Sequence, residues 1–342
     1  MNLQVGDLLI ADVFNDFGLL VMSKDRLLTA KDIDILVRHN IQYVDIAFRN
    51  SIDLPIGGPE ENLEAISEEM DNAVQGVRQL FEQVAAEGKI DETIVNEHFE
   101  PLTEHFQKEH DVVSLLLMLS GKDEYTYSHS VQVGMLCYYI AVWAGHTEEE
   151  ALEAGKGGYL HDIGKSRIPS EILNKPGKLT KEEFDLVKRH TNYGYEIISK
   201  SLRNPEAPAL VALQHHERFD GSGYPYGASG ERIHPYAKIC AIADIYSAMI
   251  STRVYREKRD LLNVLRELHQ LSFSELDPHI TLTFIRHMVP NFIGKKAVLK
   301  SGEVGEIIMT NQNDLFRPLI RIGDKFIDLS RARELEVYEI VS

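Results

Sequence analysis

The first fifty residues alternate short apolar runs with turn-forming residues. Apolar runs at 8–13 and 18–22 flank a polar Asn-Asp pair, a pattern typical of a β-hairpin. Apolar residues at helical spacing follow Thr29, a favourable N-cap residue, and so predict a helix. The apolar run at 41–46 could return as a further strand. We therefore expect a small α/β domain over residues 1–50.

A stretch rich in proline and glycine separates this segment from a longer helical one. Residues 51–60 include Pro55, Pro59 and an adjacent pair of glycines, which indicates a boundary. Apolar residues then recur at helical spacing on an acidic background, and Gly88 predicts a break into two helices. We interpret residues 51–119 as a linker and helical region that packs on the next domain or pairs with another subunit.

Residues 120–290 have a mainly helical pattern. The strongly apolar stretch at 131–143 predicts a buried helix. Thr180 and Glu183 have the spacing of a capping box and open another helix, which we expect to carry His190. Further helices are predicted at 149–161, 208–217 and 237–251. The chemically distinctive residues fall at the ends of these helices and in the loops between them.

The pattern changes again after Pro290. Short apolar runs separated by Gly, Asn or Asp predict strands at 297–299, 305–309, 319–322 and 325–329. Residues 291–342 are therefore expected to form a small all-β module. The expected fold class is mainly α, with a small α/β N-terminal domain and this C-terminal β module.

Composition and charge limit the classes of partner. The chain has 342 residues, enough for two or three domains of roughly 100–200 residues each. Its 36 basic and 53 acidic residues give a formal net charge of −17, which opposes binding to DNA or to an anionic membrane. A small anionic ligand is not opposed, because a local metal cluster can reverse the sign inside one cleft.

The absence of a visible signal peptide and the surroundings of the cysteines predict a cytoplasmic protein. The N-terminus lacks the basic and apolar segments of a signal peptide, and no run approaches ~18 apolar residues. Cys137 and Cys240 are the two cysteines, and their apolar surroundings predict buried, reduced thiols.

Several metal-ligating residue types stand at helix ends or on apolar helices. His161-Asp162 and His215-His216 follow apolar helices, and Asp244 lies within one, where an unpaired carboxylate is costly to bury. One metal cluster would offset the cost of burying all of these polar side chains. Neutral imidazole and carboxylate ligands suit iron, manganese or zinc, and such sites commonly hydrolyse phosphodiesters.

Ordered blocks around these residues resemble the HD-GYP phosphodiesterases, a branch of the HD metal-dependent phosphohydrolases. The resemblance covers about residues 121–290. The matching blocks are 123–130, 161–165, 168–169, 175–180, 190, 215–225, 244 and 252–256. The resemblance implies cleavage of the cyclic dinucleotide c-di-GMP to linear pGpG, and in some members onward to GMP, which lowers a bacterial second messenger. A few members act on cyclic GMP-AMP.

The same resemblance implies a binuclear site with iron or manganese as the favoured metal. The implied ligands are His129, His161, Asp162, His190, His215, His216 and Asp244. Asp162 would bridge the two ions, with His129, His161 and Asp244 on one and the remaining three histidines on the other. A hydroxide bridging the two ions would attack the phosphorus.

The resemblance also implies contacts to the substrate. Lys165 would contact the scissile phosphate and aid the leaving group. Arg253 and Arg256 would bind phosphate through their planar guanidinium groups. Tyr224, in the Gly-Tyr-Pro loop, would stack on guanine, form a hydrogen bond or meet a partner protein. Some family members carry a glutamate that supports a third metal at the position of Tyr125, so two metals are expected here and further cleavage of pGpG is the less expected step.

Three other interpretations remain open. The same chemistry could act on another cyclic dinucleotide, such as cyclic GMP-AMP. An HD-type nucleotidase could act on a monophosphate, although the arginine pair and the Gly-Tyr-Pro loop favour a larger substrate. A weakly active domain could bind a nucleotide or a partner and signal through that loop, but such a domain has no need for seven ligands. The sequence also leaves open a homodimer or a signalling-protein partner.

Overall fold

A computed structural model describes most of the chain. The described residues are 3, 5–9, 13–14, 20–24, 26–39, 41, 44, 46, 59–107, 125–250, 261–311 and 313–341. The chain divides into two compact units, one of Met1–Ile66 with His105–Val112 and one of Ser67–Glu104 with Val113–Ser342. None of the helices in these described ranges has both the length and the hydropathy needed to cross a membrane.

The smaller unit contains the hairpin and helix that the sequence predicts. Strands β1 (Val13–Phe14) and β2 (Leu20–Met22) are antiparallel, and α1 spans Ala30–Arg38. Thr29 caps α1 through a reciprocal pair of hydrogen bonds with Asp32. The described part of the expected strand at 41–46 contributes one isolated bridge, between Ile46 and Leu9. A small apolar core lies between these elements: Leu9, Val13, Met22, Leu28 and Leu36.

Two long helices follow, as the break at Gly88 predicts. Helix α2 spans Pro59–Glu87 and α3 spans Glu92–Gln107. Gly88 adopts a φ of 74°, a left-handed conformation that glycine tolerates and that commonly ends a helix. The hydroxyl of Tyr159 donates to the carbonyl of Ala73 at 2.6 Å, which links the second half of α2 to the helices that carry the histidines.

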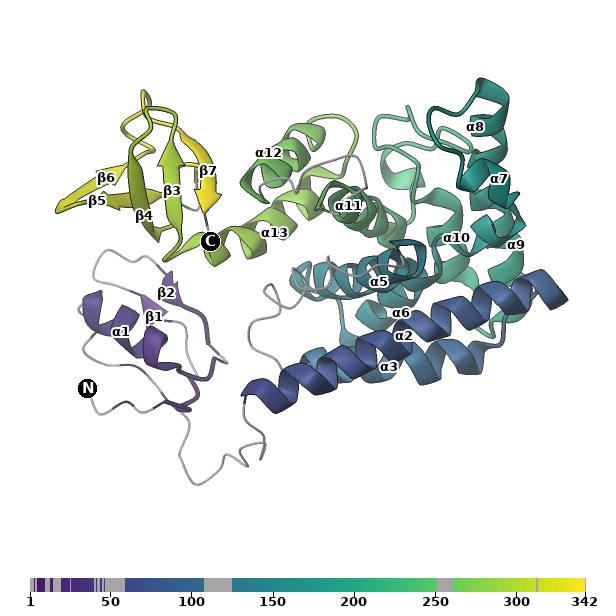
Figure 1. Cartoon of the computed structure of the whole chain (residues 1–342), viewed down its shortest axis with the longest axis horizontal. Coiled ribbons are helices and arrows are strands. Elements are labelled where there is room, and N and C mark those ends of the chain that lie inside the picture. Colours follow the sequence, from purple (N-terminus) through teal and green to yellow (C-terminus); the bar gives the residue numbers. More distant parts are fainter. Residues whose placement is uncertain are drawn as a thin grey trace. The chain divides into compact units, whose positions relative to one another are not determined.

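The larger unit is mainly helical (Figure 1). Helix α5 is apolar on all sides and is buried against α6 and α11, as expected for a central helix. Cys137 of α5 and Cys240 of α11 are buried, and neither forms a disulfide. The elements are α5 (Tyr125–Trp143), α6 (Glu148–Leu160), η3 (Ile163–Arg167), α7 (Ser170–Leu173), α8 (Lys181–Lys188), α9 (His190–Ser201), α10 (Glu206–Gln214), η4 (Gly230–Arg232), α11 (Pro235–Ile250), α12 (Leu261–Leu271), α13 (Pro278–Met288) and η5 (Val289–Phe292).

One helix assignment from the sequence is wrong. The capping box at Thr180 opens α8 as expected, but α8 ends at Lys188 and His190 begins the separate helix α9. Arg189 lies between the two as a turn. His190 therefore stands at the N-terminus of a helix.

The C-terminal residues form a five-stranded antiparallel sheet. Its strands are β3 (Lys296–Leu299), β4 (Val304–Met309), β5 (Leu319–Ile322), β6 (Lys325–Asp328) and β7 (Val337–Val341), in the order β6-β5-β4-β3-β7. Four strands match the predicted runs, and β7 was not predicted. Strand β7 pairs with β3, placing Ile340 opposite Ala297. The fold class is thus mainly α with a small C-terminal sheet.

Candidate metal centre

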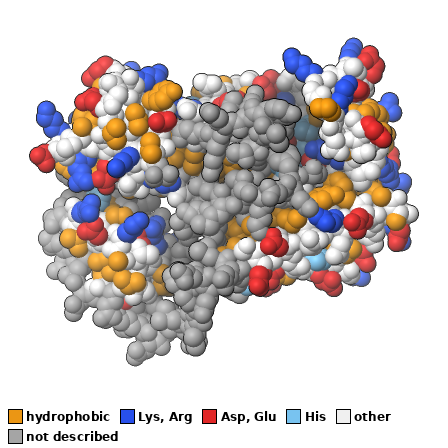
Figure 2. All heavy atoms as spheres, viewed as in Figure 1, with side chains coloured by type: hydrophobic (Ala, Val, Ile, Leu, Met, Phe, Trp, Pro, Cys, Tyr) orange, Lys and Arg blue, Asp and Glu red, His pale blue; other side chains and the backbone are white. Residues whose placement is uncertain are grey.

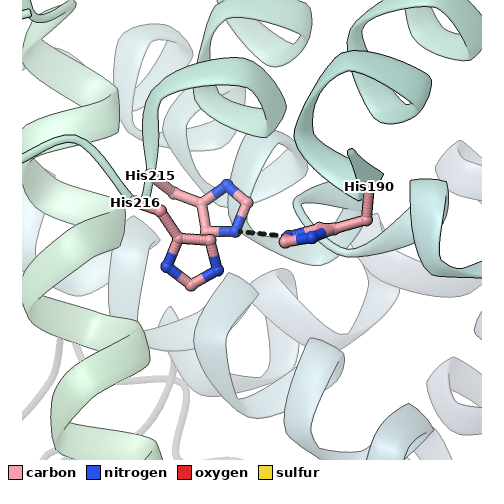
Figure 3. Close-up of side chains that lie close together, drawn as sticks. All are labelled: His190, His215 and His216. Carbon is pink, nitrogen blue, oxygen red and sulfur yellow. Dashed lines mark hydrogen bonds between the residues drawn. The ribbon is translucent and has the colours of Figure 1, made fainter. Parts of the chain in front are cut away.

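The helix ends of the larger unit bring six of the seven predicted ligands into two groups. His129, His161 and Asp162 form one group, and His190, His215 and His216 form the other, which Figure 3 shows. Within each group the potential ligand atoms lie within 4.8 Å of one another. Asp244 joins the first group through its carboxylate, 3.1 Å from Nε2 of His129.

Backbone carbonyls orient three of the imidazole rings. Nδ1 of His161 donates to the carbonyl of Gly158 at 2.6 Å, and Nδ1 of His190 donates to that of Val187 at 2.7 Å. Nδ1 of His215 likewise donates to the carbonyl of Ala212 at 3.0 Å. Because a carbonyl can only accept, these bonds place a ring proton on Nδ1, so that the neutral form of each ring has its lone pair on Nε2. Such bonds typically orient metal-binding histidines.

A pair of polar side chains orients His129 so that its Nδ1 also donates a hydrogen bond. The hydroxyl of Ser247 donates to Oε1 of Gln132 at 2.5 Å and lies 2.9 Å from Nδ1 of His129. Since this hydroxyl has one proton, it accepts the hydrogen bond from Nδ1–H of His129. Nε2 of His129 is then directed toward Asp244.

Asp162 lies between the two groups. One carboxylate oxygen, Oδ2, is 3.2 Å from Nε2 of His161, and the other, Oδ1, is 3.4 Å from Nε2 of His190. Lys165 donates to Oδ2 at 2.5 Å. A carboxylate with one oxygen toward each group has the geometry of a bridging ligand.

The donor set fits divalent metal ions. His161 and Asp162 are each 1% exposed. Among the described residues, Nε2 of His161 and Oδ1 of Asp162 have no hydrogen-bond partner, and Nε2 atoms of His190 and His215 face each other at 3.3 Å. Buried polar atoms without partners are costly, and lone pairs that converge repel one another. Cations in the two groups would remove both penalties, with imidazole and carboxylate ligands that suit iron, manganese or zinc.

The electrostatics favour the ligand forms of most of these residues. Burial alone would raise the pKa of Asp162, but His161 and Lys165 together hold it well below its usual value. Burial likewise opposes ionisation of Asp244, and His129 nevertheless keeps its pKa well below normal. Burial lowers the pKa of His215 well below its usual value and that of His216 to about 3. These carboxylates are therefore ionised and these imidazoles neutral near pH 7.

His161 differs from the other histidines. Burial lowers the pKa of its imidazole, but the adjacent carboxylate of Asp162 outweighs burial and raises that pKa above its usual value. A metal ion at this position would replace the proton that Asp162 otherwise favours.

Gly164 permits the close approach that brings Asp162 to His190. A Cβ atom at residue 164 would lie 1.9 Å from the carbonyl oxygen of His190 and 2.5 Å from the amide nitrogen of Gly194. Any side chain would therefore push η3 away from α9. Gly164 lies in one of the blocks that resemble the HD-GYP family, but the sequence alone indicates no role for it.

The Gly-Tyr-Pro loop packs against the second group. The ring of Tyr224 lies on that of His216, with centroids 4.7 Å apart and planes at 31°. The Tyr224–Pro225 peptide bond is cis. Buried Glu217 holds the loop by accepting a hydrogen bond from the amide of Tyr226 at 2.8 Å. Tyr224 thus lies at the candidate metal centre, and the ring of His216 covers part of its ring.

Two predicted substrate contacts, Arg253 and Arg256, lie outside the described residues, as does Glu124. Tyr125 begins α5.

The sequence did not indicate the roles of Ser247, Gln132 and Glu217, which support the ligands or the Gly-Tyr-Pro loop. Ser247 lies three residues after Asp244 in an apolar helix, a spacing that places both on one helix face and could have indicated its role.

Comparisons with known proteins find similar sequences. Residues 113–280 match the HD domain family. A cyclic di-GMP phosphodiesterase of Pseudomonas aeruginosa is 34% identical over 65% of this chain and 56% of its own length. A 3'3'-cGAMP-specific phosphodiesterase of Vibrio cholerae is 33% identical over 56% of this chain and 46% of its own length. The chain spans about half the length of the curated relatives it matches.

A solved structure shares the fold. The structure of an HDG"Y"P protein from Bdellovibrio bacteriovorus aligns over 82% of this chain and 94% of its own, with a TM-score of 0.51. Sequence identity to that protein is 14%, so the similarity concerns the fold.

Proposed function

Since the chain belongs to the HD-GYP family of HD domains, we propose that it is a metal-dependent phosphodiesterase that hydrolyses c-di-GMP to linear pGpG. The observation that carries this proposal is the position of Asp162 between two groups of buried metal-ligating side chains. A relative named as a cyclic di-GMP phosphodiesterase supports the choice of substrate.

We assign the chemistry to residues 120–290. In this proposal residues 1–50 form a small α/β domain, 51–119 a linker and helical region, and 291–342 a β module. The proposed ligands are His129, His161, Asp162 and Asp244 for one ion and Asp162, His190, His215 and His216 for the other. When bound, two divalent ions, iron or manganese, would polarise the scissile phosphate and activate water as the nucleophile.

The protein's own side chains would bind and orient the substrate. Lys165 presents its ammonium group beside Asp162 and is partly exposed, so it can contact an incoming phosphate and stabilise the departing ribose oxygen. Arg253 and Arg256 are proposed as further phosphate ligands on the basis of the sequence alone. The ring of Tyr224 packs on that of His216 and so lies beside the second group.

Cyclic GMP-AMP is the second candidate substrate. One relative is named as a 3'3'-cGAMP-specific phosphodiesterase, and its identity to this chain, 33%, is close to the 34% of the cyclic di-GMP phosphodiesterase. Both dinucleotides present the same phosphodiester linkage, so the ligand groups alone do not distinguish them. The difference would be made by contacts to the second purine.

A time course with purified protein tests this proposal. The protein is loaded anaerobically with Fe(II) or Mn(II) and incubated in parallel with c-di-GMP and 3'3'-cGAMP, and products are separated by chromatography. We expect pGpG from c-di-GMP, and its accumulation without GMP would support a two-metal site in a chain with Tyr125. Faster cleavage of 3'3'-cGAMP would reassign the substrate. If a fully loaded protein cleaves neither dinucleotide, the binding-only interpretation replaces this one.

A further inference from the structure

We propose that Phe184 of α8 is a stacking surface for one purine base of the cyclic dinucleotide. This inference rests on the proposed function and assigns a base-binding residue to the same site. It starts from the exposure of Phe184, whose side chain is 47% exposed. None of the eight residues of α8 is buried, so this phenylalanine contributes little to a hydrophobic core.

The ring of Phe184 is connected to the metal centre through Tyr224. The centroids of the Phe184 and Tyr224 rings are 6.4 Å apart with planes at 79°, an edge-to-face contact. Tyr224 in turn lies on His216. The exposed ring of Phe184 is therefore separated from the second ligand group by one aromatic side chain, that of Tyr224. In this proposal, a base attached to a phosphodiester held at the ligands lies against the ring of Phe184.

Lys188 limits where that base can lie. Its Nζ is 5.2 Å from the centroid of Phe184 and 5.9 Å from that of Tyr224, and it pairs with Asp185 at 2.5 Å. The ammonium group thus sits over both rings and obstructs insertion of a base between them. The base would instead stack on the part of the Phe184 ring that faces solvent, with Lys188 holding the ring in place.

Local charge does not oppose an anionic dinucleotide at this surface. Residues 164–189 contain seven basic and four acidic side chains, in a chain whose net charge is −17. Basic, acidic and hydrophobic side chains all lie on the surface around α8 (Figure 2). Four of the seven basic side chains are ion-paired, namely Lys165, Arg167, Lys175 and Lys188, so the exposed aromatic ring is the main contact offered to the base.

Three variants test the stacking surface in the full-length, metal-loaded protein. Phe184→Ala removes the ring and Phe184→Trp replaces it with another. Phe273→Ala is the matched control, because Phe273 is 78% exposed and its ring contacts His269 rather than the Gly-Tyr-Pro loop. Two quantities are measured: KM and kcat for c-di-GMP, and fluorescence quenching of a c-di-GMP analogue in which 2-aminopurine replaces one guanine, recorded directly after mixing.

Loss of one stacked base predicts a rise in KM of about 5- to 150-fold in Phe184→Ala, the equivalent of about 1–3 kcal/mol. We expect kcat to stay near that of the unsubstituted protein, and the quenching that stacking causes to disappear. Phe184→Trp should restore both KM and quenching, and Phe273→Ala should behave as the unsubstituted protein.

Two results would overturn the stacking surface. One is a Phe184→Ala variant that keeps KM within about twofold and retains the quenching. The other is a fall in kcat at constant KM, which would make Phe184 a support for Tyr224. Failure of the proposed function is separate: the unsubstituted protein would then cleave no c-di-GMP. Quenching would still decide the inference in that case, because its absence in the unsubstituted protein overturns the surface and its loss in Phe184→Ala supports it.

Discussion

Individual side chains of the metal centre are costly to bury and are supported by specific neighbours. His161, His190 and His215 each donate from Nδ1 to a carbonyl of the preceding helical turn. Sequence proximity thus fixes both the tautomer and the direction of each ring. His129 has a different support, since its Nδ1 bonds to Ser247 of another helix. The first three rings are oriented locally, and the fourth depends on packing of α5 against α11.

The position of Asp162 leads to a prediction for metal content. Asp162→Ala removes the carboxylate that lies between both groups, so we expect bound metal to fall and turnover to be abolished. Elemental analysis and the c-di-GMP assay measure the two effects. Asp314→Ala, which removes a carboxylate of the C-terminal module paired with Arg317, is the control. Full activity in Asp162→Ala would rule out a bridging role.

The hydrogen bond to Ser247 leads to a second prediction. Ser247→Ala removes the acceptor for Nδ1–H of His129, so the ring is free to rotate or change tautomer. Loss of such a supporting bond typically lowers metal affinity about 10- to 100-fold. Ser272→Ala removes another buried hydroxyl, bonded to the carbonyl of His269, and should leave metal affinity unchanged. Equal affinities in the two variants, measured by competition with a chelator, would contradict this role.

At the scale of elements, local patterns predicted most of the helices and strands. The N-cap at Thr29, the capping box at Thr180 and the break at Gly88 appear in the structure as expected. The sequence could not indicate that α8 and α9 are separate, because one non-helical residue at Arg189 leaves the apolar spacing almost unchanged. Strand β7 was missed although Val337 to Val341 mixes apolar and charged residues as an edge strand does.

The site shows the same division between local and long-range information. Residue types identified the candidate ligands, since several costly polar side chains on apolar helices need a common explanation. Their division into two groups required the resemblance, and their distances required the fold. Gly164 acts through a contact with residues distant in the sequence, which no local pattern reveals. Ser247 also bonds to a distant residue, His129, and only its spacing from Asp244 gives a local indication of its role.

The contact between η3 and α9 leads to a third prediction. Gly164→Ala would place a Cβ against the backbone of His190, so the two elements must separate, at a cost of about 1–3 kcal/mol or more. Separation would also move Asp162 from His190 and weaken metal binding. Gly194→Ala is the milder comparison, because its Cβ would lie 3.1 Å from the methyl group of Ala212, a tight contact but far from the 1.9 Å overlap at residue 164, so we expect a smaller loss of stability. Thermal unfolding and metal titration of both variants measure the difference.

At the scale of the whole molecule, the metal centre joins helices that are distant in the sequence. Its ligands come from α5, α9, α11 and the ends of α6 and α10. Metal that binds only the folded state should therefore stabilise the entire helical unit. Free metal at a hundred times Kd adds ~2.7 kcal/mol, which corresponds to a rise in Tm of about 5–10 °C. Calorimetry with and without chelator tests this expectation, and an unchanged Tm would contradict it.

The most direct measurement is a titration of metal-free protein with Mn(II) under anaerobic conditions, in which the initial rate of pGpG formation from c-di-GMP is followed. Two groups of ligands that share Asp162 predict no product without metal and a rate that reaches its plateau near two equivalents. Product formation by the metal-free protein, or a plateau at one equivalent, would contradict a binuclear phosphodiesterase site.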